Sequence, residues 1–242
     1  MPNVKGKYQR ILLKLSGEAL AGDEDFGVCL SALKGLVASI KEVKDMGVQI
    51  AIVVGGGNFF RGENLARDGF DRITADQMGM LSTVMNGLAL RRALESENIT
   101  TTLMSTIAIP SLVDVYNRNH ALKLMDENHV MIFTAGVGTA LFSTDSAASL
   151  RAIDMGADIL LKASTTDAVY SEDPKKNPQA ERYEHLNYQF VIEKQLGVMD
   201  MTAFCLCQEH SLPIRVFNAQ IPGVLKAIVE GKQEGTLIDS EG

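Results

Sequence analysis

The chain has few cysteines and histidines, which argues against a disulfide scaffold or a zinc site. Its three cysteines, Cys29, Cys205 and Cys207, are too few and too badly spaced for a disulfide framework. The Cys-x-Cys pair lies within a helical pattern, where buried thiols are expected in preference to redox chemistry. The four histidines lack ligand spacing, so no zinc site is predicted.

Long apolar runs and an excess of basic charge are also absent. No stretch approaches the roughly 18 consecutive apolar residues of a membrane span, and the start of the chain lacks the apolar core of a signal peptide. The formal net charge of −7 argues against a nucleic-acid surface. We therefore expect a cytoplasmic globular protein with neither nucleic-acid nor membrane partners. Any phosphate would be bound locally, through a few cations, backbone amides and Mg²⁺.

Two common phosphate-binding motifs are missing, and a different glycine motif is present. The chain has no G-x-x-x-x-G-K-[ST] and no G-x-G-x-x-G after a strand, so neither a Walker-type loop nor a dinucleotide fold is predicted. Gly55-Gly56-Gly57 instead follows the apolar run Val48 to Val54. Three glycines at the carboxyl end of a buried parallel strand expose consecutive N–H groups and so form a seat for phosphate. A plain turn is the alternative.

Apolar runs alternate with stretches of helical spacing, a pattern typical of an α/β protein whose mostly parallel central sheet is sandwiched by helices. The expected strands are Arg10 to Leu15, Val48 to Val54, Thr101 to Ser105, Val130 to Ala135, Ile159 to Ala163 and Ile214 to Phe217. With 46% apolar residues, the chain can build one large core. We expect a single domain over 1–242, with two lobes, about 1–160 and 161–242, that share one sheet.

Two crossover helices are predicted in detail. The first places Leu30, Leu33, Val37, Ile40 and Val43 on one face and ends near Gly47. The second opens at the capping-box pattern Thr74-x-x-Gln77. Its inward-facing residues are expected to be Met78, Leu81, Met85 and Leu88.

Several polar residues near expected strand ends could carry chemistry. Lys14-Leu15-Ser16-Gly17 ends the first strand, where amides can meet a phosphate and Lys14 can reach its charge, although a solvated lysine is the alternative. Asp145 opens a helix after the Gly- and Thr-rich loop Gly136 to Thr144, a position that the helix dipole favours in any case. Asp200 is a candidate reacting-centre acid or a plain helix cap. In the long polar loop Ser164 to Arg182, Asp173-Pro174 is by default a turn.

Taken together, the motifs resemble those of the bacterial uridylate (UMP) kinases, in the amino-acid kinase superfamily. The resemblance runs from about Tyr8 to Ile238 and includes the following segments in order: Lys14 to Leu20, Gly55 to Gly62, Asp76 to Gly87, Thr144 to Ala148, Val198 to Asp200 and Leu212 to Asn218. The long Asp76 to Gly87 match is far more specific than any glycine count.

The resemblance implies phosphoryl transfer from ATP to UMP in pyrimidine nucleotide biosynthesis, with Mg²⁺ held mainly by the ATP phosphates, on the three-layer amino-acid kinase fold. It implies that Lys14, Asp145 and Asp200 form the reacting centre. The implied ATP-binding residues are Lys14, Leu15, Ser16, Gly17, Gly57, Arg61, Ser164, Tyr170 and Asp173. The implied UMP-binding residues are Gly56, Asp76, Gly136, Val137, Gly138, Thr139, Ala140, Leu141, Phe142, Ser143 and Thr144.

The same resemblance implies a homohexamer, GTP activation and possible UTP feedback inhibition. The residues implied for GTP are Gly22, Asp23, Glu24, Asp25, Phe26, Gly27 and Arg91. However, Glu95, Thr102, Arg118 and His129 stand where other members carry His, Arg, Trp and Arg, so weak or absent GTP activation is expected.

Two loops depart from the family pattern. The acceptor loop usually reads Gly-Thr-Gly-Asn-Pro, whereas here it is Gly136-Val-Gly-Thr-Ala140, and Val137 cannot hydrogen-bond a base. The ATP loop, usually Lys-Ala-Thr-Lys-Val-Asp-Gly, reads Lys162-Ala-Ser-Thr-Thr-Asp-Ala168 and lacks one lysine and one glycine.

Two other functions are compatible with parts of the pattern. One is a kinase of the same superfamily that phosphorylates a carboxylate or carbamate, which the Asp76 to Gly87 match disfavours. The other is a nucleotide sensor without transfer activity. The combination of Lys14, Asp145 and Asp200 argues against a sensor, because binding alone does not need that set.

Overall fold

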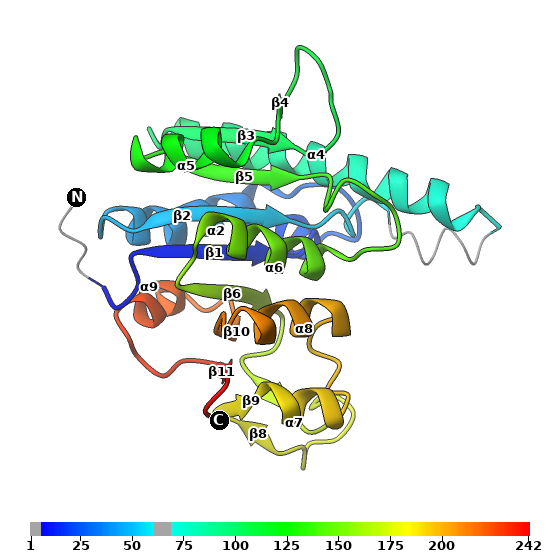
Figure 1. The fold of residues 1–242 in the computed structure, drawn as a ribbon, viewed down its shortest axis with the longest axis vertical. Helices are drawn as coiled ribbons and strands as arrows, with labels where there is room; N and C mark the ends of the chain where they lie inside the picture. The colour runs from blue at the N-terminus through cyan, green and yellow to red at the C-terminus, as the bar shows by residue number, and fades with distance from the viewer. Residues whose placement is uncertain (1–5, 61–68) are drawn as a thin grey trace.

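A computed structural model describes residues 6–60 and 69–242, and its centre is a twisted sheet (Figure 1). The strand order among the described residues is β4-β3-β5-β2-β1-β6-β10-β11-β9, and every neighbouring pair is parallel except β10 with β11. The strands are β1 (Arg10–Leu15), β2 (Gln49–Val54), β3 (Thr101–Ser105), β4 (Asp114–Val115), β5 (Val130–Thr134), β6 (Ile159–Ser164), β9 (His185–Asn187), β10 (Ile214–Asn218) and β11 (Thr236–Asp239). The six predicted strands and the α/β class are therefore confirmed.

A second small sheet pairs β7 (Val169–Tyr170) with β8 (Arg182–Tyr183) in antiparallel fashion. It lies within and just after the long polar loop that follows β6. The inner strands of the main sheet are buried almost throughout: all five residues of β5 are buried, as are the last five of β1 and β2. Continuous burial on both faces is typical of a parallel sheet covered by helices on each side.

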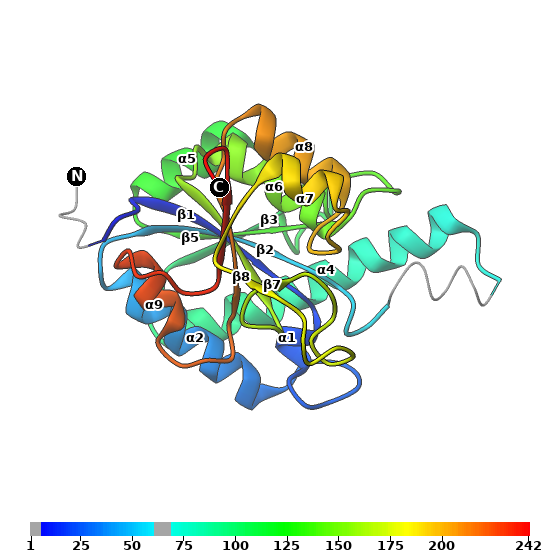
Figure 2. The same cartoon turned by 90° about the horizontal axis from the view of Figure 1, so that it is seen from below.

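Helices cover both faces of the sheet (Figure 2). One face packs against α2 (Leu30–Lys44), α4 (Arg72–Ser96) and α9 (Val224–Val229), beside the short α1 (Glu18–Ala21). The other packs against α5 (Arg118–Asp126), α6 (Thr144–Met155), α7 (Tyr188–Glu193) and α8 (Met201–Glu209). None of the helices in the described part of the chain has the length and apolarity that a membrane crossing requires.

The first predicted crossover helix forms as α2, with one difference at its start. Leu33, Val37, Ile40 and Val43 are buried, but Leu30 is 74% exposed. Leu30 is the first helical residue, and Leu33 is the first residue of α2 whose side chain is buried. Gly47, with φ 85°, turns the chain into β2, as expected.

The second predicted helix, α4, has a different N-cap residue and a different buried face from those predicted. Its N-cap is Asp71, whose carboxylate accepts from the N–H groups of Ile73 and Thr74, so the capping box at Thr74 is wrong. Leu81 and Met85 are about half exposed instead of inward. The buried face of α4 is Ala75, Ser82, Thr83, Val84, Asn86, Gly87, Leu90 and Leu94. Its small and polar members contact loops at the strand ends, which an apolar periodicity does not reveal.

Only one cysteine of the Cys-x-Cys pair is buried as expected. Cys207 is buried on α8, and burial raises the pKa of its thiol to about 11. Cys205 is exposed, because residues two apart on a helix point in different directions.

Candidate functional site

Two glycine-containing turns lie side by side at the carboxyl edge of the sheet. Strands β1 and β2 pair in parallel up to Leu15 and Val54, and the Gly55 N–H donates to the carbonyl of Leu15 at 2.8 Å. A Cβ on Gly17 would lie 2.4 Å from Asn58 Oδ1 and 2.7 Å from Gly57 N. Only glycine allows the Lys14 to Gly17 turn to approach the Gly55 to Gly57 turn this closely.

A charged cluster lies next to these turns. Lys14 in β1 and Lys162 in β6 are register partners on adjacent strands, and both point at Asp145 in the first turn of α6. Lys14 Nζ lies 2.9 Å from Asp145 Oδ1, and Lys162 Nζ lies 2.7 Å from Asp145 Oδ2. The side chains of all three residues are at most 13% exposed. One carboxylate thus bridges two ammonium groups.

The pKa shifts in this cluster follow from its geometry. Burial by itself would raise the pKa of Asp145, but the ammonium groups of Lys14 and Lys162 outweigh burial and hold the pKa of this carboxyl below its ordinary value. Burial lowers the pKa of Lys162, and repulsion from Lys14 adds to the effect, although Asp145 opposes both. One carboxylate therefore faces two lysine side chains in a site that is largely closed to water.

Lys162 is a site residue that the sequence reasoning missed. It holds Asp145 from the side opposite Lys14 and also donates to the carbonyl of Val198. A signal was available in the sequence, because a lysine interrupts the apolar run Ile159 to Ala163 in the same way as Lys14 interrupts Arg10 to Leu15. A charged side chain inside a buried strand requires a partner.

Asp200 connects the starts of two helices beside this cluster. It is the N-cap of α8, accepting from the Ala203 N–H at 3.0 Å, so the plain cap is confirmed. Its carboxylate also accepts from the hydroxyls of Ser143 and Ser146, and Ser143 is the N-cap of α6. Asp200 therefore holds the amino ends of α6 and α8 together, with its oxygens already engaged by protein donors.

The Gly136 to Thr144 loop is anchored to α4 at two points. The Ala135 N–H donates to Thr83 Oγ1 at 2.7 Å, and the Leu141 N–H donates to Asp76 Oδ2 at 2.9 Å. Asp76 is also held by Arg72, whose Nε lies 2.9 and 3.0 Å from the two carboxylate oxygens.

Within the loop, Gly136, Gly138 and Leu141 have positive φ, and the side chains of Leu141 and Phe142 are exposed. Val137 packs against the apolar cluster that lies under α6, Thr139 is exposed and Ala140 is buried.

The residues predicted for the adenosine end lie at the end of β6, in β7 and in the loop that follows β7. Ser164 Oγ lies 3.1 Å from Thr166 Oγ1. The Tyr170 hydroxyl donates to Asp167 Oδ1 at 2.8 Å, and Arg182 Nε donates to the other oxygen of Asp167 at 3.0 Å. Asp173 accepts from the Lys175 N–H within its own turn, as the default turn prediction expects. Asp167, which accepts from the Tyr170 hydroxyl, and Arg182, which donates to Asp167, were not among the residues predicted from the sequence.

The loop predicted for GTP packs against the glycine turn. The Gly27 N–H donates to the Asn58 carbonyl, and the ring of Phe26 makes an edge contact with Phe59 at 5.3 Å between centroids. Arg91 Nε lies 4.0 Å from Glu95 on α4. These contacts do not test GTP binding, which stays a prediction. Arg61 lies outside the described residues.

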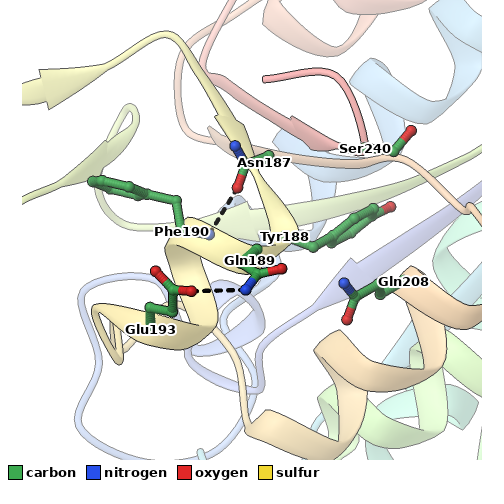
Figure 3. Close-up of a pocket in the computed structure, with 7 residues that line it drawn as sticks. All are labelled: Asn187, Tyr188, Gln189, Phe190, Glu193, Gln208 and Ser240. Atoms are coloured by element: carbon green, nitrogen blue, oxygen red, sulfur yellow. Dashed lines mark hydrogen bonds between the residues drawn. The ribbon is translucent and has the colours of Figure 1, made fainter.

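A cavity of about 470 Å³ lies between α7, α8 and the C-terminal segment (Figure 3). It is lined by Asn187, Tyr188, Gln189, Phe190, Glu193, Gln208 and Ser240, none of which is a predicted site residue. Figure 3 shows Asn187 accepting from the Phe190 N–H and Gln189 donating to Glu193, so these polar groups are partnered within α7 and its cap.

Comparisons with known proteins show what the chain is similar to. The amino acid kinase family model matches residues 9–218. A uridylate kinase of Saccharophagus degradans is 52% identical over 242 residues, 100% of this chain and 98% of the relative. A uridylate kinase of Pseudomonas putida is 52% identical over 96% of this chain and 94% of the relative.

Solved structures similar to this chain are also UMP kinases. The crystal structure of a UMP kinase from Bacillus anthracis superimposes with a TM-score of 0.94 at 37% identity, covering 97% of both chains. A UMP kinase from Ureaplasma parvum superimposes with a TM-score of 0.90 at 36% identity, covering 97% of this chain and 100% of the other.

Proposed function

Because the chain belongs to the amino acid kinase family, with uridylate kinases as full-length relatives, we propose that the carboxyl-edge cluster performs the reaction of those enzymes. The protein is a nucleoside monophosphate kinase that transfers the terminal phosphoryl group of ATP to UMP, giving ADP and UDP. The observation that carries the residue assignment is the Lys14–Asp145–Lys162 bridge beside the glycine turns.

The chemistry needs no general base. The nucleophile is a phosphate oxygen of UMP, which is ionised near neutral pH because its second pKa is about 6. The protein has to bring two polyanions together and stabilise the charge that spreads over the transferring group. Lys14 and Lys162 supply positive charge where water is largely excluded, so each is worth more there than at the surface. Asp145 lies between the two ammonium groups, and its ion pairs with them fix the orientation of both lysine side chains.

The two nucleotides would enter from two sides of the cluster. On the donor side, the amides of Leu15 to Gly17 and of Gly57, together with Lys14 and Arg61, would line the ATP phosphates. Ser164, Tyr170 and Asp173 would hold the adenosine. On the acceptor side, Gly56, Asp76 and the Gly136 to Thr144 loop would hold UMP. In the structure Asp76 already anchors that loop, so its carboxylate would have to serve the nucleotide and Leu141 together or exchange one for the other.

The donor set fits a Mg²⁺ that arrives on ATP and is not bound by a protein cage. Each oxygen of Asp145 forms an ion pair with one lysine, and the oxygens of Asp200 accept from two serine hydroxyls and one backbone N–H. Within the described ranges, no three His, Cys, Asp or Glu side chains converge as a metal site. When bound, the metal would neutralise phosphate charge, while the residues above bind and orient the nucleotides.

An assay of ADP release across acceptors tests the proposal. UMP, CMP, aspartate, acetylglutamate and carbamate are supplied separately at fixed Mg-ATP, with Lys14→Ala as the matched inactive variant. We expect UMP to exceed every other acceptor and the variant to lose most of that rate. A higher rate with a carboxylate or carbamate would instead support an acyl-phosphate kinase, and binding without ADP release would support a nucleotide sensor. CMP turnover close to that of UMP would show that base selectivity is relaxed, as expected if Val137 makes no hydrogen bond to the base.

We further propose self-association into a homohexamer, with one surface that supports it. The outer side of α4 exposes Ile73, Leu81 and Met85, which are between 43% and 50% exposed. Leu81 and Met85 are four residues apart and Ile73 lies eight residues before Leu81, and exposed apolar side chains in such an arrangement suit burial against a second copy. Light scattering of Leu81→Glu against the unaltered chain tests this, and an unchanged mass in the variant would contradict it. UTP feedback and a cytoplasmic location stay predictions.

A further inference from the structure

Helix α4 contacts both loops that the proposed function assigns to nucleotide binding, and it does so through two neighbouring buried residues. Thr83 and Asn86 are three positions apart, one turn of helix, so they face the same direction. Thr83 is 5% exposed and Asn86 is fully buried. Both carry hydrogen bonds that leave the helix, one to each loop.

Asn86 holds the glycine turn on the donor side. Its Nδ2 donates to the Gly55 carbonyl and to Asn58 Oδ1, each at 2.7 Å, and Asn58 Nδ2 donates back to Asn86 Oδ1 at 3.0 Å. The Asn58 amide also donates to the Gly27 carbonyl at 2.6 Å. Glycines leave the backbone free to adopt many conformations, so this paired amide network selects one of them.

Thr83 holds the start of the acceptor loop. Its hydroxyl donates to the Met80 carbonyl and accepts from the Ala135 N–H, each at 2.7 Å. Ala135 has φ 61°, a left-handed conformation that an alanine adopts only at an energetic cost. The hydrogen bond to Thr83 offsets that cost. Without it, Ala135 can relax and carry the Gly136 to Thr144 loop with it.

We propose that α4 is the common support of both nucleotide sites, with Asn86 as a positioning residue for the ATP loop and Thr83 as a positioning residue for the UMP loop. The inference rests on the site assignment proposed above. Neither side chain has to touch a nucleotide. Each one raises the fraction of the enzyme whose loop is in the binding-competent conformation, and apparent affinity scales with that fraction.

The proposal predicts that each of two variants raises mainly one of the two KM values. Thr83→Val keeps the shape of the side chain and removes the hydroxyl, and we expect it to raise KM for UMP about tenfold and KM for ATP by less than about twofold. Asn86→Asp keeps the acceptor for Asn58 but loses both donations. We expect about a tenfold rise in KM for ATP and a smaller rise, below about threefold, in KM for UMP, because Gly56 of the same turn is assigned to UMP. Asn86→Ala, which buries no charge, replaces Asn86→Asp if the latter fails to fold.

Two variants serve as controls. Thr83→Ser retains a hydroxyl and should restore KM for UMP. Ser82→Ala removes a buried hydroxyl from the same helix, but one that, among the described residues, donates to the Met78 carbonyl within α4. It should leave both KM values unchanged, so that a general effect of altering the buried face of α4 can be recognised.

The outcomes separate this inference from the site assignment. The crossed KM pattern supports the inference. If Thr83→Val and Asn86→Asp shift both KM values equally, or lower only the amount of folded protein, the two residues are merely structural and the inference is overturned. Lys14→Ala in the same assay tests the site itself. Loss of turnover in Lys14→Ala, together with unshifted KM values in the α4 variants, would reject the inference and leave the site in place.

Discussion

The strongest test of the charged cluster is Asp145→Asn, because it removes one negative charge that holds two positive ones. Two ammonium groups, 2.9 and 2.7 Å from the carboxylate oxygens, would then face each other across a neutral amide. Removing one partner of a buried ion pair typically costs about 3–5 kcal/mol, since the remaining charge is left without compensation. For a chain of this size, that corresponds to a fall in melting temperature of roughly 6 to 20 °C.

The melting temperature of the same variant should rise more on adding nucleotide than that of the unaltered enzyme. ATP phosphates bring negative charge to the ammonium groups that Asp145 no longer neutralises, so the nucleotide replaces part of the lost interaction. We expect Mg-ATP to raise the melting temperature of Asp145→Asn by more degrees than that of the unaltered chain. Turnover should nevertheless fall by on the order of a hundredfold, because the lysines are no longer held in fixed directions.

Asp154→Asn is the matched control. Asp154 also lies on α6 in an ion pair, with Arg151 at 2.5 Å, but it is outside the proposed site. This variant should lose some stability while keeping normal turnover and a normal response to nucleotide. The reasoning is refuted if Asp145→Asn melts at the same temperature as the unaltered chain, or if Mg-ATP stabilises both proteins equally.

Three further predictions concern the same machinery. Lys14→Ala should fold normally, as judged by circular dichroism, and lose about a hundredfold in turnover; near-normal kcat would remove Lys14 from the mechanism. Because the pKa of Lys162 is lowered, its charged form is lost at a pH below the ordinary lysine value of 10.5, so kcat/KM for ATP should decline on the alkaline side before that pH. A profile that stays level up to 10.5 contradicts this. GTP should shift the UMP saturation curve little, and a several-fold shift would show that the altered residues Glu95, Thr102, Arg118 and His129 still permit activation.

The sheet could be predicted closely because the inner strands are mostly apolar runs bounded by glycine or polar residues. Runs such as Val130 to Thr134 have no alternative to burial on both faces. The helix α4 could not be oriented in this way. Its large residues Leu81 and Met85 face outward and its small polar residues face inward, which is the reverse of the usual pattern.

The candidate site was only partly visible in the sequence. Lys14 and Asp145 were found through motifs at strand and helix ends, whereas Lys162 becomes a partner only through the parallel pairing of β1 with β6. Likewise, the bonds of Thr83 to Ala135 and of Asn86 to Gly55 join positions 52 and 31 residues apart. Such contacts depend on the register of the whole sheet, which local patterns do not encode.

The measurement that tests the central claim most directly is a crystal structure of the enzyme with UMP and a non-hydrolysable ATP analogue. The account predicts that the acceptor phosphate and the terminal donor phosphate meet within hydrogen-bonding reach of Lys14 Nζ and Lys162 Nζ, with Asp145 still between the two lysines. Phosphates bound elsewhere, or a nucleotide site away from the carboxyl ends of β1 and β6, would contradict it.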